Sequence, residues 1–307
     1  MAKQITVKGI TKRYGSQLAV NDVSFTISTG EIVGFIGPNG AGKSTTMKII
    51  TGTLPPDKGE VLIGDMSPGE HLKSIRKILG YLPENNPLYL EMYIREYLEY
   101  VAGLYQLRGK KRKEQIDRVI EMTGLTVEAH KKIGSLSKGY RQRVGLSQAL
   151  IHDPEILILD EPTTGLDPNQ LVEIRNLISN IGKQKTVLLS THILQEVDAI
   201  CDRVIIIDQG KILADESSDS LKERGTGTFR TIHVELDAPA DPEIWKQLSS
   251  IQNVKSLPGN QFLLESSEKS DIRGDIFNFA VSQELTILSL SMKEKSLEDL
   301  FRELTRA

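Results

Sequence analysis

The sequence lacks several features that would place a protein in a class at once. It has one cysteine, Cys201, which excludes an internal disulfide and a cysteine-based metal cluster and favours a reducing compartment. Its longest apolar runs, such as Ile156 to Leu159, have the length of strands, whereas a membrane span needs about 20 apolar residues. The first residues, MAKQITVKGI, lack the apolar core of a signal peptide. We therefore expect a chain that does not cross a membrane by itself.

An excess of charge of one sign is also missing. The 38 lysine and arginine residues are balanced by 41 aspartate and glutamate residues, for a net charge of -3. Because there is no basic excess, no nucleic acid partner is expected. The basic run from Lys110 to Lys113 has no interleaved aromatic residue, so a solvated helix start is favoured over a phosphate-binding patch.

The 307 residues fit two domains, and the composition changes along the chain. From Glu216 to Thr228 it shifts to Ser, Gly, Thr, Lys and Glu, which is typical of a linker. We therefore predict a first domain over residues 1–220 and a second over residues 229–307. From Leu88 to Gln148 apolar residues recur at helical spacing, which predicts a helical subdomain at about 88–150.

The rest of the first domain has the pattern of an α/β fold. Apolar runs of four to five residues are typical of strands that a parallel sheet buries on both faces. The runs of this kind are Ile32 to Ile36, Ile156 to Leu159, Thr186 to Ser190 and Val204 to Asp208. Other segments alternate or are mixed, which favours an antiparallel flank, and these are Ile5 to Val7, Val23 to Ile27 and Glu60 to Ile63.

The second domain is predicted to be small and α+β. We expect a strand, a helix, a hairpin turning at Pro258-Gly259-Asn260, a helix, a strand and a closing helix capped by Ser296 with Asp299 three residues on. This order resembles a ferredoxin-like split unit. The segments are Ile232 to Leu236, Ile244 to Ile251, Val254 to Leu257, Gln261 to Glu265, Ile272 to Ala280, Thr286 to Leu290 and Leu297 to Leu304.

The most specific motif is a glycine-rich turn between a predicted strand and a predicted helix. It matches the phosphate-loop pattern G-x-x-x-x-G-K-[ST] at every position. Its glycines let backbone N–H groups face one anion, and the helix N-terminus adds a favourable dipole. We expect Lys43 to reach the β- and γ-phosphates of a nucleotide and the Ser44 hydroxyl to ligate Mg²⁺. The motif consists of Gly37, Pro38, Asn39, Gly40, Ala41, Gly42, Lys43, Ser44 and Thr45.

A second signal is the acidic pair Asp160 and Glu161, which ends the apolar run that begins at Ile156. The carboxyl edge of the sheet is where ligands bind in open α/β folds. Adjacent strand residues point to opposite sides, so we expect the two carboxylates to have different tasks. Asp160 is predicted to hold Mg²⁺ through water. Glu161 is predicted to orient the attacking water or to accept its proton.

Further segments, in order along the chain, resemble the motifs of the ABC ATPase family. Residues 136–142, LSKGYRQ, are similar to the signature motif L-S-G-G-Q, with matches at Ser137 and Gly139 and departures at Lys138 and Tyr140. From the residues alone, Ser137 caps either a helix whose free N–H groups meet an anion or an ordinary helix. The resemblance implies the first role.

Other matches complete the resemblance. Asp167, in Gly165-Leu-Asp167-Pro, resembles the D-loop aspartate, which in that family lies at a dimer interface. His192, in Ser190-Thr-His192, resembles the switch histidine, which contacts the γ-phosphate. Tyr14 matches the aromatic residue that stacks on adenine, and an exposed tyrosine ring suits that contact. The resemblance thus implies catalytic roles for Lys43, Glu161 and His192, and nucleotide contacts for the phosphate loop, Tyr14, Ser137, Gly139 and Asp167.

One position departs from the family pattern. Glu84 stands where most members have a glutamine that senses Mg²⁺ and faces the membrane partner. A carboxylate oxygen is a good Mg²⁺ ligand, but it adds negative charge near the phosphates. Glu84, the stretch from Asn85 to Tyr89, and Leu297 to Phe301 resemble the ABC-2-type exporter ATPases of gliding motility and drug resistance.

The resemblance covers about residues 3 to 225. It implies an ABC cassette with a mixed sheet core, an antiparallel β subdomain and a helical subdomain. It further implies ATP hydrolysis with Mg²⁺ in a homodimer, where each ATP lies between one phosphate loop and the opposing signature helix. Such a dimer would serve an ABC-2-type permease at the cytoplasmic face of the membrane, in export.

The residues disfavour two other functions. A soluble ABC ATPase that handles ribosomes or DNA is disfavoured because the chain has one cassette, no coiled-coil arm and no basic bias. A nucleotide-gated binding protein without turnover is disfavoured because Lys43, Asp160, Glu161 and His192 are all present.

Overall fold

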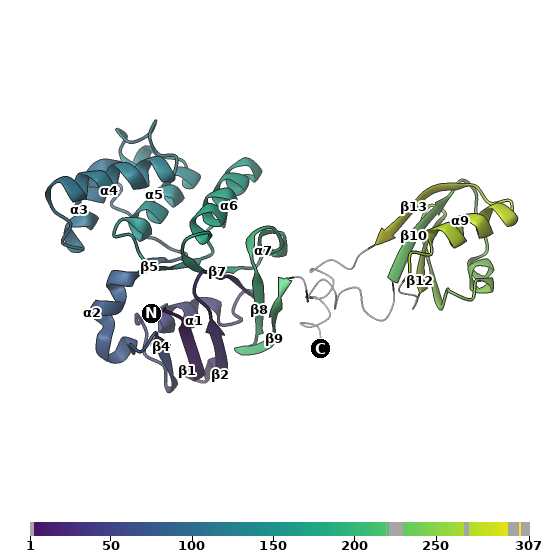
Figure 1. Ribbon diagram of the computed structural model, residues 1–307, viewed down its shortest axis with the longest axis horizontal. Helices are drawn as coiled ribbons and strands as arrows, with labels where there is room; N and C mark the ends of the chain where they lie inside the picture. The colour runs from purple at the N-terminus through teal and green to yellow at the C-terminus, as the bar shows by residue number, and fades with distance from the viewer. Residues whose placement is uncertain (1–2, 219, 221–229, 267–269, 294–300, 302–307) are drawn as a thin grey trace. The chain divides into compact units, whose positions relative to one another are not determined.

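The computed structural model describes residues 3–218, 220, 230–266, 270–293 and 301 (Figure 1). The chain divides into two compact units, Met1–Ser218 and Asp219–Ala307, and each has its own hydrophobic core. The expected linker began at Glu216, but Glu216 and Ser217 are the last residues of strand β9 (Lys211–Ser217), which pairs with its neighbour in the sheet. The remainder of that segment lies outside the described residues, apart from Ser218 and Ser220.

The described part of the first unit is built on a six-stranded sheet in the order β5-β6-β7-β3-β8-β9. Every residue of β3 (Ile32–Ile36), β6 (Ile156–Asp160) and β7 (Thr186–Thr191) is buried, as their apolar runs predict. These strands, β5 (Leu79–Leu82) and β8 (Arg203–Asp208) run parallel, and β9 pairs antiparallel at the edge. Because β6, β7 and β3 are adjacent and parallel, the loops that follow them meet at one edge.

A second sheet of the first unit is antiparallel, in the order β2-β1-β4 among the described residues. Its strands are β1 (Ile5–Tyr14), β2 (Gln17–Ile27) and β4 (Lys58–Ile63), all longer than predicted. Register shifts interrupt the alternation of side chains along β1, which hides its length in the sequence pattern. Helix α1 (Lys43–Ile50) contributes Met47 and Ile50 to the core that joins the two sheets. In that core the rings of Phe25 and Phe35 lie 5.5 Å apart.

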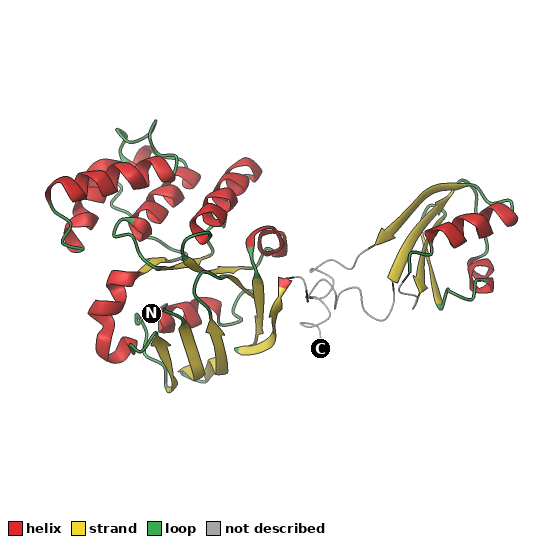
Figure 2. Cartoon of the chain, in the orientation of Figure 1, coloured by secondary structure: helices red, strands yellow, loops and turns green. Residues whose placement is uncertain are grey.

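Helices α3 (Ile94–Leu104), α4 (Gly109–Met122) and α5 (Lys138–Leu150) form the predicted helical region, and Figure 2 shows them gathered in red away from the antiparallel strands. Helix α4 starts at Gly109, so the basic run from Lys110 forms its solvated first turn, as expected. The other helices of the unit are α2 (Pro68–Ile78), α6 (Pro168–Gly182) and α7 (Leu194–Ile200).

The described part of the second unit is a four-stranded antiparallel sheet in the order β11-β12-β10-β13, with helix α9 (Arg273–Ser282). Strand β10 (Arg230–Leu236) pairs with both β12 (Gln261–Ser266) and β13 (Ile287–Lys293). The hairpin from β11 (Asn253–Leu257) to β12 turns at Gly259 and Asn260, which both have positive φ. The assignment of this unit to the ferredoxin-like class stays a prediction.

The predicted helix from Ile244 to Ile251 is wrong. The structure has a short 3₁₀ helix, η2 (Pro242–Gln247), and the backbone becomes extended at Leu248. Trp245 and Ile251 are nevertheless buried in the core, so apolar residues at helical spacing reach it from a 3₁₀ turn and the loop after it. The expected closing helix falls outside the described residues, apart from Phe301. Within the described part of the chain, no helix has both the length and the apolar character that a membrane span requires.

Candidate active site

A cavity of about 480 Å³ opens at the edge of the sheet where the loops after β3, β6 and β7 meet. It brings together predicted residues from distant parts of the chain, including Tyr14, Lys43, Glu84, Glu161 and His192. The full lining is Tyr14, Gln17, Ala19, Asn39, Gly40, Gly42, Lys43, Ser44, Thr45, Glu84, Glu161, Thr164 and His192.

The phosphate loop wraps around the buried side chain of Lys43. The Lys43 ammonium donates to the backbone oxygens of Gly37 at 2.8 Å and Pro38 at 3.3 Å, and 6% of the residue is exposed. Gly42 has φ +106°, and a Cβ there would lie 2.4 Å from the backbone oxygen of Ala19. Because L-residues with a side chain rarely adopt this conformation, glycine is required at that position.

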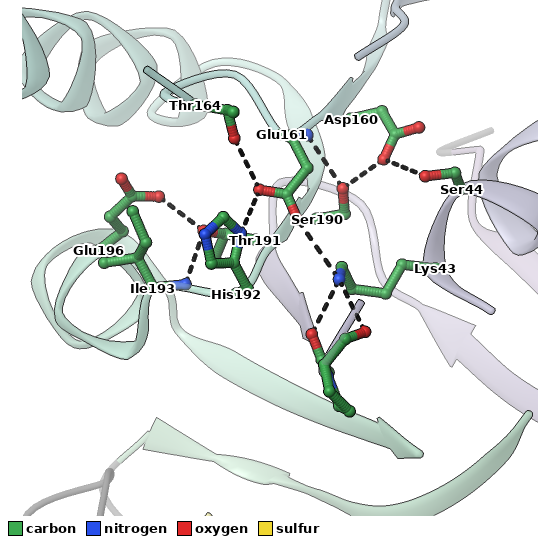
Figure 3. Close-up of polar contacts among 12 residues, drawn as sticks. Lys43, Ser44, Asp160, Glu161, Thr164, Ser190, Thr191, His192, Ile193 and Glu196 are labelled. Atoms are coloured by element: carbon green, nitrogen blue, oxygen red, sulfur yellow. Dashed lines mark hydrogen bonds and ion pairs between the residues drawn. The ribbon is translucent and has the colours of Figure 1, made fainter. Parts of the chain in front are cut away.

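Glu161 lies at the centre of the contacts in Figure 3. Its Oε1 forms an ion pair with Lys43 Nζ at 3.3 Å. Its Oε2 accepts from Thr164 Oγ1 at 3.0 Å and lies 2.8 Å from His192 Nδ1. The carboxylate is buried, yet it is bonded on both oxygens, which offsets the cost of removing it from water.

Glu161 and Asp160 point different ways, as expected, but the reason differs from the prediction. Strand β6 ends at Asp160, and Glu161 has a left-handed backbone with φ +52°. The division therefore comes from a sharp turn after the strand and not from strand alternation. Asp160 is buried behind Ser44, and its Oδ1 accepts from Ser44 Oγ at 3.1 Å.

Two hydroxyl residues that the sequence analysis did not assign lie at the end of β7. Ser190 Oγ donates to Asp160 Oδ1 at 2.5 Å and accepts from the Glu161 backbone N–H at 3.0 Å. Thr191 Oγ1 donates to the buried Glu196 at 2.8 Å and accepts from the Ile193 N–H at 3.0 Å. A strand that ends in Ser-Thr-His is the signal that could have found them.

Tyr14 and Glu84 enter the cavity from two further elements. Tyr14 is the last residue of β1 and is 48% exposed, so its ring is free to stack on a planar group. Glu84 follows β5. In β5, burial raises the pKa of Tyr81 well above its ordinary value, and the charges of Asp160 and Glu84 add to the shift. The Tyr81 hydroxyl therefore stays protonated.

Three predicted residues lie away from this cavity, and we name Ser137, Gly139 and Asp167 the cap group. Ser137 caps α5 by accepting from the Tyr140 N–H at 3.4 Å. Asp167 caps α6 by accepting from the Gln170 N–H at 2.9 Å. A Cβ on Gly139 would lie 2.2 Å from Gln170 Oε1, so the starts of α5 and α6 are in contact. The structure thus brings these residues to each other but not to Lys43.

The charge in the cavity is mixed, because Glu84 and Glu161 line it together with Lys43. Lys43 and the backbone N–H groups at the start of α1 supply positive potential, and no arginine is among the described residues that line it. Among those described residues, no group of three or more His, Cys, Asp or Glu forms a ready metal cage. Ser44 and Asp160 nonetheless place two hard oxygen donors side by side.

Known proteins resemble this chain along nearly its whole length. The family model described as ABC transporter matches residues 20–164. The bacitracin transport ATP-binding protein BcrA of Bacillus licheniformis is 34% identical over 304 residues, which cover 98% of this chain and 97% of that protein. The Nod factor export ATP-binding protein I of Rhizobium sp. (strain N33) is 36% identical over 228 residues, which cover 73% of this chain and 74% of that protein.

A solved structure agrees with the fold of the first unit. It is a dimeric ATP-binding cassette in a post-hydrolysis state bound to ADP and Pi, with a TM-score of 0.64 and 28% identity, over 70% of this chain and 98% of that chain. Fold, motif order and overall similarity therefore agree. The chain belongs to the ABC transporter family, as an ATP-binding subunit that hydrolyses ATP.

Proposed function

We propose that the cavity binds ATP with Mg²⁺, and that two copies of this chain together drive a separate ABC-2-type exporter permease. The observation that carries the proposal is the meeting of Lys43, Glu161 and His192 in one cavity, with Asp160 and Ser44 behind them. Phosphoryl transfer needs little covalent chemistry from the protein. It needs positioned charge around the phosphate and a group that orients water, and these residues supply both.

ATP would enter along the phosphate loop with its adenine on Tyr14. Lys43 is paired with Glu161 and with loop carbonyls, so binding exchanges these contacts for the β- and γ-phosphate oxygens. The exchange has a second effect, because it releases Glu161 Oε1. Nucleotide binding thereby makes the carboxylate available to a water beside the γ-phosphate.

The residues at the back of the cavity fit Mg²⁺. This ion prefers oxygen ligands and shares its coordination with phosphate oxygens and waters, which suits a site that has no complete protein cage among the described residues. Ser44 would ligate it directly and Asp160 through water, and Glu84 supplies a further carboxylate at the cavity wall. When bound, Mg²⁺ neutralises charge that develops on the phosphate oxygens.

In the reaction, Glu161 orients a water molecule and accepts its proton. The water oxygen bonds to the γ-phosphorus while the bond from that phosphorus to the bridging oxygen breaks, which yields ADP and phosphate. His192 lies 2.8 Å from Glu161 Oε2 and is 43% exposed at its side chain, so its ring both fixes the carboxylate and faces the cavity.

A second copy of the chain would complete the site. One phosphate loop covers the nucleotide from one side, and the described lining of the cavity includes no arginine to cover the other. The cap group presents two capped helix starts, with backbone N–H groups suited to a phosphate, outside its own cavity. In a two-fold dimer each cap group would face the γ-phosphate held by the other copy.

The permease is proposed from the relatives and from a groove. The names of two relatives refer to bacitracin transport and to Nod factor export. A groove of about 480 Å³ lies between β5 and α3 and contains Asn86 and Gln148. Its aromatic wall suits an amphipathic segment of a membrane partner at the cytoplasmic face. The tyrosines in the groove are Tyr81, Tyr89, Tyr97, Tyr100 and Tyr105.

The variant Glu161→Gln tests the catalytic part. It keeps the size of the side chain but removes the base, so phosphate release should fall at least about 100-fold while ATP binding is retained. ATP should then trap the protein as a dimer, which light scattering would detect. The exposed Glu99→Gln on α3 is the matched control and should behave as wild type. Wild-type turnover by Glu161→Gln would exclude Glu161 as the base.

The transport part needs the partner. Tagged Glu161→Gln protein is purified from gently solubilised cells with ATP and Mg²⁺. We expect a polytopic membrane protein in a roughly equal amount. Recovery of ribosomes or DNA instead would support a soluble ABC ATPase and contradict the transport proposal, with the ATPase assignment intact.

A further inference from the structure

We propose that Ser190 is a positioning residue for ATP hydrolysis, because one hydroxyl holds both members of the acidic pair. The inference rests on the proposed roles of Asp160 and Glu161 and adds a residue that those roles do not include. Ser190 is fully buried at the end of β7, between the backbone of β6 and the back of the cavity.

The direction of each hydrogen bond at Ser190 is fixed. A serine hydroxyl has one hydrogen to donate, and a backbone N–H can only donate. Ser190 Oγ therefore accepts from the Glu161 N–H at 3.0 Å and must give its hydrogen to Asp160 Oδ1 at 2.5 Å (Figure 3). One side chain thus contacts both residues of the pair, through the carboxylate of one and the backbone of the other.

The contact with Asp160 fixes the rotation of that carboxylate. Ser190 Oγ and Ser44 Oγ both donate to Oδ1, one from β7 and the other from α1. Hydrogen bonds to an ionised oxygen are the strong ones, and the pair of them holds the group in one orientation. Without the Ser190 hydroxyl, Asp160 Oδ1 would keep only the hydrogen bond from Ser44, and Ser44 is the residue whose hydroxyl would turn to Mg²⁺. The Ser190 bond is therefore the one that persists when the metal is bound.

The contact with Glu161 supports a strained turn. Glu161 has φ +52°, a conformation that costs a residue with a side chain more than it costs glycine. Its N–H is shared between Ser190 Oγ at 3.0 Å and the Ser190 backbone oxygen at 3.2 Å. This turn is what directs the Glu161 side chain to Lys43, Thr164 and His192 and not along the strand.

The test compares variants of Ser190 by two readouts. The first is the Mg²⁺ concentration needed for half-maximal binding of ATP, measured in the Glu161→Gln background, where turnover is expected to be at least about 100-fold slower. The second is kcat and KM in the otherwise unchanged chain. We expect Ser190→Ala to raise the Mg²⁺ requirement and to lower kcat by about tenfold, with KM for ATP at saturating Mg²⁺ little changed.

A matched control separates this role from general stability. Ser147 in α5 is also fully buried, and its hydroxyl bonds to the Arg143 backbone oxygen at 2.9 Å and to Thr123 Oγ1 at 2.8 Å. Ser147→Ala should lower the melting temperature to a similar degree but leave the Mg²⁺ requirement and kcat unchanged. Ser190→Thr and Ser190→Val have the same shape and differ in the hydroxyl, so they decide the matter if the alanine variant does not fold.

The proposal is overturned if Ser190→Ala has the wild-type Mg²⁺ requirement and kcat, or if the threonine and valine variants behave alike. It is supported if threonine recovers activity that valine loses. Failure of the proposed ATPase function would give a different result. The wild-type chain would then show no ATP hydrolysis, or its hydrolysis would not depend on Glu161.

Discussion

The site residues fall into two groups that are built in opposite ways. Lys43, Glu161 and His192, which we name the cavity group, come from the start of α1 and from the turns after β6 and β7, and the Glu161 side chain contacts the other two. The cap group is held by contacts within a single turn, as Ser137 with the Tyr140 N–H and Asp167 with the Gln170 N–H. We propose that the first group carries out chemistry within one chain, and that the second presents its helix starts to the nucleotide held by another copy.

This difference explains why a single chain looks incomplete. The cavity group neutralises itself without nucleotide, since the Lys43 ammonium and the Glu161 carboxylate are partners. The two helix starts of the cap group differ from this, because the Asp167 carboxylate caps α6 whereas α5 has only the neutral Ser137 hydroxyl at its positive end, which favours an anion. Damage to the first group should therefore abolish binding or turnover in the same chain, and damage to the second should act through a partner copy.

The largest expected effect comes from mixing two inactive chains. Lys43→Ala should lose turnover by at least about 100-fold because the phosphates lose their buried cation. Ser137→Arg should lose turnover to a similar degree by blocking the opposing site, while binding of ATP by the single chain persists. In a mixed dimer one site carries both defects and the other carries neither, so about a quarter of wild-type activity should return when the two are combined.

Two controls make this experiment decisive. Each variant mixed with itself should stay inactive, which excludes simple dilution effects. Lys43→Ala mixed with Glu161→Gln should also stay inactive, because both changes lie in the cavity group. Each site of every dimer then contains either the changed Lys43 or the changed Glu161. Recovery in the second mixture, or none in the first, would contradict the separation into two groups.

The sequence predicted the residues of the site better than the contacts that position them. The phosphate loop and the acidic pair are each a contiguous stretch, so one short pattern carries Lys43 and Ser44 and another carries Asp160 and Glu161. The left-handed turn at Glu161 and the role of Ser190 depend on a contact across 29 residues between neighbouring strands, which no local pattern encodes. The same limit applies to η2, where apolar spacing suited a helix but the chain took a 3₁₀ turn.

An intermediate effect is expected from a change at Thr191, which tests how the His192 turn of the cavity group is held in place. Thr191 Oγ1 accepts from the Ile193 N–H and donates to Glu196, which is 1% exposed, so the turn that carries His192 is held from behind. Thr191→Val should lower kcat by roughly threefold to tenfold, because the loss of one hydrogen bond at a buried carboxylate loosens that turn. Steady-state phosphate release measures it.

Thr191→Ser keeps the hydroxyl and serves as the control, with kcat close to wild type. The effect of Thr191→Val should also vanish in the His192→Ala background, since the turn then has no imidazole to aim. An undiminished loss in that background would show that Thr191 acts on stability and not on His192.

The smallest expected effect concerns the contact between the end of α5, the helix that Ser137 caps, and strand β5 of the six-stranded sheet. His152 follows α5, which carries Ser137; its Nε2 lies 3.2 Å from the backbone oxygen of Leu79 in β5, and its ring stacks on Tyr105 at 3.8 Å. Burial lowers the pKa of His152 from its ordinary value of 6.5 to about 4, and the positive charge of Lys185 acts in the same direction. The folded chain thus holds this histidine neutral at pH values where the unfolded chain protonates it.

The sign of the pH dependence follows from that difference. Stability from His152 is present above pH 6.5 and is lost as the pH falls from 6.5 toward 4, because the unfolded chain then binds a proton that the folded chain does not. The loss should reach about 1.4 kcal/mol of unfolding free energy per pH unit for this one group. His152→Phe keeps a ring against Tyr105 and should flatten that slope in urea unfolding, whereas exposed His130→Gln should leave it unchanged. An equal slope in the phenylalanine variant would show that groups other than His152 set the acid sensitivity of the folded chain.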